Sequence, residues 1–379
     1  MEIRHARYVI LGAGAVGAAT AYHLAKRREP VVLVEQFSLG HNRGSSHGAA
    51  RITRHSYADP AYAKLMPDAF RAWKQLEADA GQPLFLRTGG VSISPSGVGY
   101  VDSVTENLLA MAIPHRRMTG TELRQAIPVF GVADDAEVVF EPDAGMLAAE
   151  RILKAEIALA RHYGGDQTVI LENCPVRRID LDGEKPTLET DLGRIVADRL
   201  IVAAGPWLPR LLPNFPVPLQ TTRQQVLYVQ PPDPVAYTPG RLPVFIYKGF
   251  DDTDAYYGMP TIENLGVKVA RHFGPEADPD RHETQVANEY RSTVRSFLWK
   301  VLPALAEAHI ERTETCFYTV APDEQFHVGP LPGRTDVLIA SPCSGHGFKF
   351  SCLIGRVLAD LATRGESGVR VDAWQSLTR

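Results

Sequence analysis

The stretch RYVILGAGAVGAATAYHLAKRREPVVLVEQF, residues 7 to 37, determines the fold class. It contains a short apolar run, a glycine turn, a segment with helical apolar spacing and a second apolar run. This order is typical of a βαβ unit, whose two strands are parallel and joined by a helix. The sequence therefore predicts an α/β protein with a parallel sheet near its N-terminus.

The glycine turn matches the pattern G-x-G-x-x-G at Gly12, Gly14 and Gly17. The first glycine permits a tight turn, the second lets the backbone approach a pyrophosphate, and the third lets helix and strand pack closely. Glu35 ends the second apolar run at the spacing expected of an acidic group that binds a ribose hydroxyl. The pattern predicts a dinucleotide site, and it leaves NAD and FAD equally open.

Composition limits the class of protein further. A chain of 379 residues is too long for one ordinary core, so we expect two domains. A formal charge of −4 without a dense basic block argues against nucleic-acid binding. The apolar runs are too short to span a membrane, and the N-terminus lacks a secretory signal. We therefore expect a cytoplasmic protein that binds neither nucleic acid nor membrane.

Two further segments combine small residues with cations. In GSSHGAARITRHSY, residues 44 to 57, a helical turn would place Arg51 and Arg54 on one side. They could hold a carboxylate, or they could be ordinary solvated arginines. In CSGHGFKFS, residues 343 to 351, Lys349 falls in the first turn of a predicted helix, an unfavourable place for a cation unless an anion binds there. That segment could also be only a tight turn.

Cys316 lies in ERTETCFYTVAPDEQFHVG, residues 311 to 329, and is one of four cysteines. It could be core filler, half of a disulfide, a metal ligand, a redox thiol or an anchor for a bound group. No Cys-x-x-Cys pair or zinc spacing is present, and a reducing compartment disfavours disulfides. We expect no metal site, and the other readings of Cys316 stay open at this point.

The remaining segments have simpler patterns. We expect helices over 61 to 80, 148 to 165 and 282 to 305, and a buried strand over 198 to 207. Residues 84 to 145 and 217 to 275 have the turn-rich pattern of short strands.

Taken in order, GAGAVG, SSHGAARITRH, TETCFYT and SGHGFKFS resemble the monomeric sarcosine oxidase family, FAD-dependent amine oxidases that include N-methyltryptophan oxidase and pipecolate oxidase. The likeness covers nearly the whole chain. It implies a glutathione-reductase-like FAD-binding Rossmann domain and a substrate domain built on an antiparallel sheet. We assign residues 1–85, 146–216 and 314–379 to the first domain, and 86–145 and 217–313 to the second.

The resemblance also implies roles for single residues. Cys316 matches a cysteine that binds FAD covalently through a thioether, and Lys268 matches a lysine implicated in oxygen activation. Arg54 and Lys349 match the pair that binds the substrate carboxylate. The predicted catalytic residues are Lys268, Arg51, His47, Tyr257 and His272, and the predicted substrate-binding residues are Arg54, Lys349, Tyr257, Ile246 and Gly345. The predicted FAD-binding residues are Gly12, Ala13, Gly14, Val16, Gly17, Glu35, Gln36, Ser45, Ser46, Arg51, Cys316, Gly345, His346, Gly347, Phe348 and Lys349.

Each of these residues could instead have an ordinary structural role. Lys268 could be a solvated lysine on a strand, Tyr257 a core aromatic residue and His272 a surface residue. Ala50 stands where sarcosine oxidases have threonine, and Ile246 replaces a methionine on the substrate side, so the substrate is open.

The resemblance implies an oxidase of sarcosine or another N-methyl amino acid that reduces oxygen to hydrogen peroxide and acts as a monomer. The alternatives are an oxidase of a cyclic secondary amino acid or of a glycated amino acid, and a related FAD dehydrogenase with another electron acceptor. An NAD-dependent or non-catalytic Rossmann protein is a third class.

Overall fold

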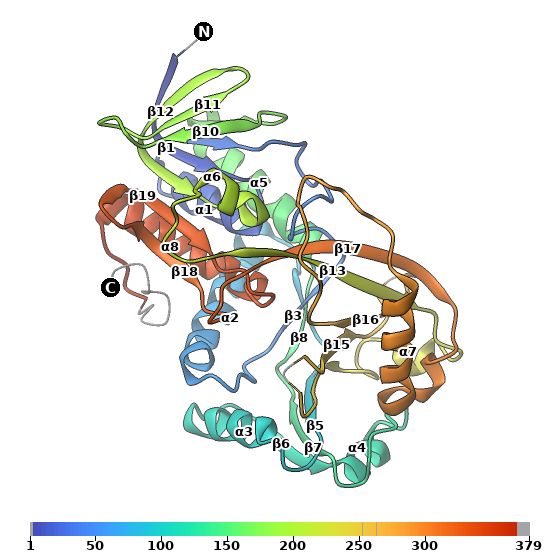
Figure 1. The fold of residues 1–379 in the computed structure, drawn as a ribbon. Coiled ribbons are helices and arrows are strands. Elements are labelled where there is room, and N and C mark those ends of the chain that lie inside the picture. The colour runs from blue at the N-terminus through green and yellow to red at the C-terminus, as the bar shows by residue number, and fades with distance from the viewer. Residues whose placement is uncertain (1–2, 252, 263, 370–379) are drawn as a thin grey trace.

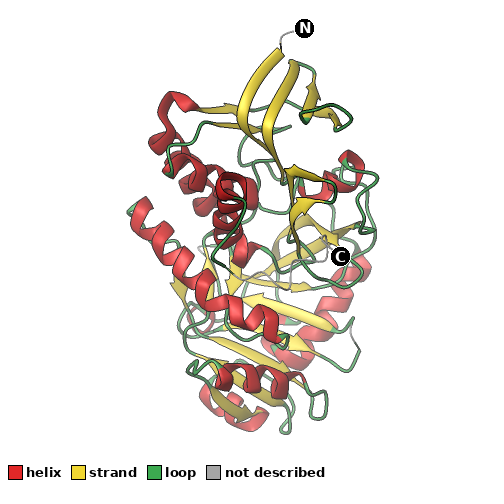
Figure 2. Cartoon of the chain, turned by 90° about the vertical axis from the view of Figure 1, so that its left-hand side faces the viewer, coloured by secondary structure: helices red, strands yellow, loops and turns green. Residues whose placement is uncertain are grey.

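The computed structural model describes residues 3–251, 253–262 and 264–369. Two large sheets organise these residues, one in each half of the molecule (Figure 1). Figure 2 shows the same two halves one above the other, with helices beside each sheet.

The first sheet contains the predicted βαβ unit. Its parallel strands β1, β2, β9, β12 and β19 give the order β9-β2-β1-β12-β19, and β10, β11 and β18 extend it by antiparallel pairing. The strands are β1 Ile3–Leu11, β2 Val31–Val34, β9 Thr168–Leu171, β10 Val176–Asp180, β11 Thr187–Thr190, β12 Gly193–Val202, β18 His327–Leu331 and β19 Arg334–Ser341. The predicted parallel sheet is confirmed. The buried strand predicted over 198 to 207 is present as β12, but it ends at Val202, and Gly205–Trp207 form a 3₁₀ turn.

Helices cover one face of this sheet. They are α1 Ala15–Lys26, α5 Ala149–Gly164 and α8 Ser351–Arg364, and α2 Pro60–Ala80 packs against α5 and α8. Asp59 caps α2 by accepting a hydrogen bond from Ala61 N at 2.7 Å, and Gly81 ends it with a left-handed φ of 63°. The predicted helices at 61 to 80 and 148 to 165 are confirmed.

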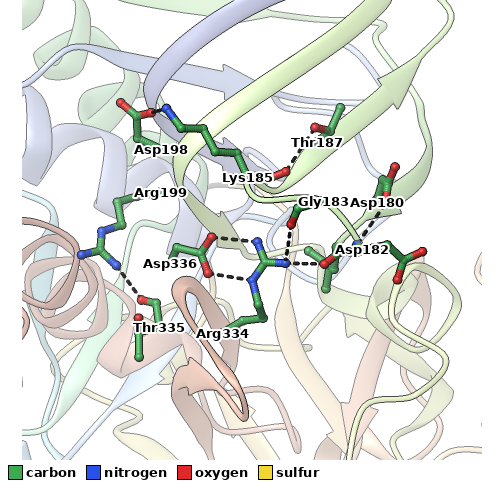
Figure 3. Close-up of polar contacts among 11 residues, drawn as sticks. Asp180, Asp182, Gly183, Lys185, Thr187, Asp198, Arg199, Arg334, Thr335 and Asp336 are labelled. Atoms are coloured by element: carbon green, nitrogen blue, oxygen red, sulfur yellow. Dashed lines mark hydrogen bonds and ion pairs between the residues drawn. The ribbon is translucent and has the colours of Figure 1, made fainter.

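The edge of the first sheet is held by side chains from distant parts of the chain. Arg334 donates two hydrogen bonds to Asp336, at 2.9 and 2.8 Å, and reaches the carbonyl oxygen of Gly183 at 3.2 Å (Figure 3). Arg199 donates to the carbonyl oxygen of Thr335 at 2.7 Å. These contacts join β19 to the β10–β11 turn and to β12, so the strand that leads to the glycine turn at 343 to 347 is fixed.

The second sheet has the order β17-β13-β16-β15-β14-β5-β7-β6, and neighbouring strands are antiparallel except β5 and β14. Its strands are β5 Gly90–Ser94, β6 Arg116–Thr119, β7 Glu137–Glu141, β13 Gln220–Val229, β14 Val244–Lys248, β15 Ala255–Met259, β16 Val267–Arg271 and β17 Ile310–Val320. The long strands β13 and β17 cross the middle of the molecule (Figure 1). Because side chains alternate along a strand, Leu227, Phe245, Val267 and Val269 pack with helix α7 (Asn288–Val301) into a core. Their neighbours in the chain face the other way.

A small third sheet joins the two halves. It consists of β3 Arg51–Thr53, β8 Gly145–Leu147 and β4 Phe85–Arg87. The predicted helical turn at Arg51 is wrong, because pairing with β8 holds residues 51 to 53 extended.

Other predicted boundaries also need correction. The structure adds α3 (Tyr100–Ala110) and α4 (Gly120–Ala126) to the segment 84 to 145, where only strands and turns were expected. Helix α4 begins with a capping box formed by Thr119 and Glu122. The predicted helix from 282 begins only at Asn288. The predicted domain boundary at 313/314 falls inside β17, so residues 314 to 320 lie in the second sheet, and residues 370–379 lie outside the described part.

In the part of the chain that the structure describes, no helix is long and apolar enough to cross a membrane.

Helix α5 carries a buried carboxyl group, that of Glu156. It is fully buried, and neither oxygen has a hydrogen-bond partner among the described residues. Burial raises the pKa of Glu156 well above its usual value. The folded protein therefore holds this proton while the unfolded chain releases it, so stability falls as pH rises above the ordinary carboxyl range.

We predict that Glu156→Leu raises the free energy of unfolding by roughly 1–3 kcal/mol at pH 8, because it removes an unsatisfied buried polar group. The gain should shrink toward pH 5. Urea unfolding at both pH values measures it, with the exposed Glu150→Leu on the same helix as control. A loss of stability, or a gain independent of pH, would contradict this account of Glu156.

Candidate active site

A cavity of about 880 Å³ extends from the glycine turn of α1 to the second sheet. Every residue predicted to bind FAD lines it except Gly17, which packs behind the turn. All the predicted catalytic and substrate-binding residues line it as well. The structure therefore brings the predicted residues together, and their individual roles stay predictions.

The glycines at one end of the cavity meet strict steric demands. Gly12 has φ +100°, and a Cβ there would lie 2.4 Å from the carbonyl oxygen of Ala203. A Cβ on Gly17 would lie 1.8 Å from the carbonyl oxygen of Gly12. Glu35 accepts hydrogen bonds from the backbone N–H of Ala13 at 2.8 Å and of Phe37 at 3.0 Å. The acidic side chain thus lies against the glycine turn, as its spacing predicts.

The segment between Ser45 and Arg51 forms one wall. Arg51 donates to the carbonyl oxygens of Ala50 and Ser45, both at 2.9 Å, and of His47 at 2.6 Å. Ser46 Oγ accepts from the N–H of Ala15, the first residue of α1, at 2.9 Å. The buried atoms Ser45 Oγ and His47 Nδ1 have no hydrogen-bond partner among the described residues.

Arg54 and Lys349 both contact Tyr57. The guanidinium of Arg54 is 4.8 Å from the ring centroid of Tyr57, and Lys349 Nζ donates to the hydroxyl of Tyr57 at 3.0 Å. Lys349 belongs to a 3₁₀ turn, Phe348–Phe350, rather than to helix α8 itself, and also donates to the carbonyl oxygen of His346 at 3.1 Å. Arg54 Nε and Nη1 are buried without a partner among the described residues.

No ion pair involving Arg54 or Lys349 occurs within the described ranges. Burial, and then the charge of Arg54, lower the pKa of Lys349 well below its usual value. Half-buried Arg54, with two buried nitrogens that lack a partner among the described residues, lies beside buried Lys349. A bound anion would favour the charged form of Lys349, and a carboxylate matches the guanidinium in shape and charge.

Lys268 projects from β16 into the same cavity, and its side chain is not solvated. It is 2% exposed, and Nζ donates to the carbonyl oxygen of Ala50 at 3.3 Å. Burial, and then Arg51, lower the pKa of Lys268 to about 7. This lysine therefore changes charge near neutral pH.

Aromatic and imidazole groups line the wall between these cations. Burial lowers the pKa of His272 to about 3 and raises that of Tyr257 to about 12, so both are neutral near pH 7. Gly345, with φ +79°, approaches His272 so closely that a Cβ would lie 2.4 Å from its Cε1. Tyr257 lines the cavity and also packs against the apolar clusters behind it, so it is partly a core aromatic residue. His272 is not a plain surface residue, because it lines the cavity.

Cys316 lies on β17 opposite Gln224 of β13 and lines the cavity as a free thiol. Burial raises its pKa. The described residues contain no cluster of side chains that could hold a metal. Glu314 and Tyr318, two residues to either side, line the cavity too, and period-two spacing from Cys316 could have identified both.

Glu141, at the end of β7, does not line the cavity, but it supports a segment that does, and the sequence did not reveal it. Its buried carboxylate accepts from the backbone N–H groups of His55 (2.9 Å) and Ser56 (3.0 Å), from His55 Nδ1 (2.6 Å) and from the hydroxyl of Ser56. His55 also stacks on Phe70 at 4.1 Å. These contacts tie the segment between Arg54 and Tyr57 to the second sheet, so Glu141 positions the anion-binding groups. Despite burial, its hydrogen bonds with His55 hold the pKa of Glu141 below its usual value.

We predict that Glu141→Gln lowers the free energy of unfolding by about 3 kcal/mol at pH 7, because it removes the charge from a buried, multiply bonded pair. A depressed pKa stabilises the fold above the usual carboxyl range, so the loss should diminish as pH falls through that range. Chemical denaturation at pH 7 and pH 4 measures this.

The control is Glu137→Gln on the same strand, where a partly exposed ion pair with Arg117 should contribute less than about 1 kcal/mol. Equal effects of the two variants at pH 7 would show that Glu141 has no special role.

Comparison with known proteins gives the class of this site. The family model described as FAD dependent oxidoreductase matches residues 7–361, and the chain belongs to this family. It is therefore an FAD-dependent oxidoreductase, and its relatives identify it as one that acts on amines.

Monomeric sarcosine oxidase from Bacillus sp. (strain NS-129) is 32% identical, over 96% of this chain and 94% of that protein. N-methyl-L-tryptophan oxidase from Salmonella arizonae is also 32% identical, over 93% of this chain and 94% of its own length. The crystal structure of L-proline dehydrogenase from P. horikoshii, 22% identical, covers 98% of this chain and 97% of its own with a TM-score of 0.84, which shows the shared fold. The predicted family resemblance and fold class are confirmed.

Proposed function

We propose that the protein is an oxidase of secondary amino acids that converts the C–N bond to an imine and reduces oxygen to hydrogen peroxide. The observation that carries this proposal is the pair Arg54 and Lys349, which faces the cavity that begins at the glycine turn. The sequence relation to sarcosine and N-methyl-L-tryptophan oxidases supports it.

The residues present fit FAD. The glycine turn leaves room for a pyrophosphate at the N-terminus of α1. Farther along the same wall, Ser45 Oγ and His47 Nδ1 have no hydrogen-bond partner among the described residues and could bind polar groups of FAD. Gly12, Gly14, Glu35 and Ser46 would hold the dinucleotide part, and Arg51 and Cys316 would flank the ring. When bound, FAD supplies the two-electron acceptor for oxidation of the amine.

The chain's own groups orient the substrate. Arg54 and Lys349 would bind its carboxylate, which fixes the adjacent C–N unit beside Tyr257, His272 and Ile246. The surrounding cations lower the pKa of a bound ammonium group, so they favour the neutral amine from which hydrogen can leave. Oxidation removes two electrons and two protons from the C–N unit, and water then hydrolyses the imine.

The simplest test of this function is oxygen uptake with sarcosine, other N-methyl amino acids, pipecolate and proline, together with assays for hydrogen peroxide and imine hydrolysis products. Uptake with at least one N-methyl amino acid is expected. Turnover only with an artificial electron acceptor would instead support a dehydrogenase, and preference for pipecolate or proline would support the cyclic alternative.

Lys268 is the group we assign to the reaction with oxygen. In its charged form it can stabilise developing negative charge, so the oxygen half-reaction should slow as pH rises through about 7, the pKa of Lys268. Lys268→Met should slow this half-reaction at least ~100-fold, as loss of a charge-stabilising donor does, and abolish its pH dependence there. Stopped-flow measurement of the two half-reactions separately, with exposed Lys300→Met as control, tests the assignment. Equal slowing of both half-reactions would refute it.

Cys316 is proposed to hold FAD through a thioether. Acid precipitation of the wild type should leave the yellow colour in the pellet, whereas Cys316→Ser should release it to the supernatant. Cys343→Ser is the matched control, because Cys343 is a free cysteine that lines the same cavity. Colour released equally from all three proteins would contradict the covalent link.

A further inference from the structure

Lys248 is a cation of the substrate cavity that the proposed reaction does not use. It ends β14 and lines the cavity two residues after Ile246, on the same face of the strand. Its side chain is half-buried, and within the described residues it has no hydrogen bond or ion pair. Its Nζ lies 5.9 Å from the ring centroid of Phe273, which is a weak contact.

The strand register shows where this charge lies. Lys248 pairs with Ala255 of β15, and the N–H of His272 donates to the carbonyl oxygen of Ala255 at 2.7 Å. Lys248, Ala255 and His272 therefore form a row across the cavity-facing side of the sheet. The charge of Lys248 depresses the pKa of His272 more than the charges of Lys349 and Arg54 do. Neutral His272 is therefore influenced by two sources of positive charge, Lys248 and the pair Arg54 and Lys349.

The acidic residues around the cavity mouth already have other roles. Asp59 accepts from the N–H of Ala61 at 2.7 Å, Asp251 from that of Thr253 at 2.8 Å, and Asp323 from that of Gln325 at 3.0 Å. Each carboxylate stabilises its own turn or helix start, and none forms an ion pair with Lys248. A half-buried cation that has no counterion in the described part of the chain, beside a proposed amino-acid site, favours a ligand that brings the anion.

We propose that Lys248 binds a second carboxylate of the substrate, so that the preferred substrates are secondary amino acids with two carboxylates. This inference rests on the proposed function, because Arg54 and Lys349 take the first carboxylate. The second carboxylate, on the side chain or on the N-substituent, points along β14 toward the cavity mouth. Ile246 lies between the two anion sites and contacts the carbon chain that joins them.

The test compares substrates of nearly equal shape that differ in one charge. N-methyl-L-glutamate and N-methyl-L-glutamine form one pair, and iminodiacetate and its monoamide form another. We expect kcat/KM at low ionic strength to favour the dicarboxylate of at least one pair by tenfold or more, mainly through KM. Lys248→Met should reduce that preference to less than threefold, Lys248→Glu should invert it, and Lys248→Arg should retain it. Lys300→Met, an exposed lysine on α7, should leave the ratio unchanged.

A binding measurement separates this site from catalysis. Glutarate, which has no amine to oxidise, should perturb the flavin absorbance at concentrations at least tenfold lower than its monoamide, and Lys248→Met should remove the difference. The inference is overturned if N-methyl amino acids are oxidised but the dicarboxylate has no advantage, or if the advantage survives Lys248→Met. If no secondary amino acid is oxidised, the proposed function on which this inference rests is overturned instead.

Discussion

Several basic side chains that share one cavity without ion-pair partners among the described residues are the constraint on which the site depends. Arg51, Arg54, Lys268 and Lys349 all face the cavity, and none of them forms an ion pair within the described residues. Buried charges without partners are costly, so the arrangement persists only where hydrogen bonds or anionic ligands offset them. The guanidinium of Arg51 donates hydrogen bonds to three carbonyl oxygens, but two nitrogens of Arg54 have no hydrogen-bond partner among the described residues. These unpartnered nitrogens are the observation behind our proposal that the cavity binds a carboxylate.

In the second sheet, side chains alternate along each strand between the core and the cavity, and this alternation directs Lys268 to the cavity. Phe245, Val267 and Val269 pack into the core beside α7, while their neighbours Ile246 and Lys268 face the cavity. A shift of one residue in register would exchange core and site side chains, so the apolar core also fixes the active-site geometry. The β13–β17 pairing extends this control to Cys316, which lies opposite Gln224. Stability and function thus depend on the same register.

Much of this could be predicted from the sequence, because the signals are local. The spacing of the glycines predicts the dinucleotide turn, and the short motifs around Arg54, Cys316 and Lys349 carry the family resemblance that places them at the site. The structure brings all of them to one cavity. Glu141 could not be found in this way, since it meets His55 only through the pairing of distant strands. The charge state of Lys268 could not be predicted from the sequence either, because the burial that lowers its pKa results from tertiary packing. The helices α3 and α4 were missed because they are interspersed with short strands and turns in the segment 84 to 145.

The central claim is that Arg54 and Lys349 recognise a carboxylate, and ligand binding without turnover tests it most directly. Titration of the yellow protein with butyrate and with butyramide, followed by flavin absorbance, gives the two dissociation constants. Butyrate should bind at least tenfold more tightly than butyramide, and Arg54→Met should weaken butyrate roughly 10- to 100-fold, as expected for loss of charge-assisted hydrogen bonds. Equal binding of acid and amide, or undiminished butyrate affinity in the variant, would contradict the account.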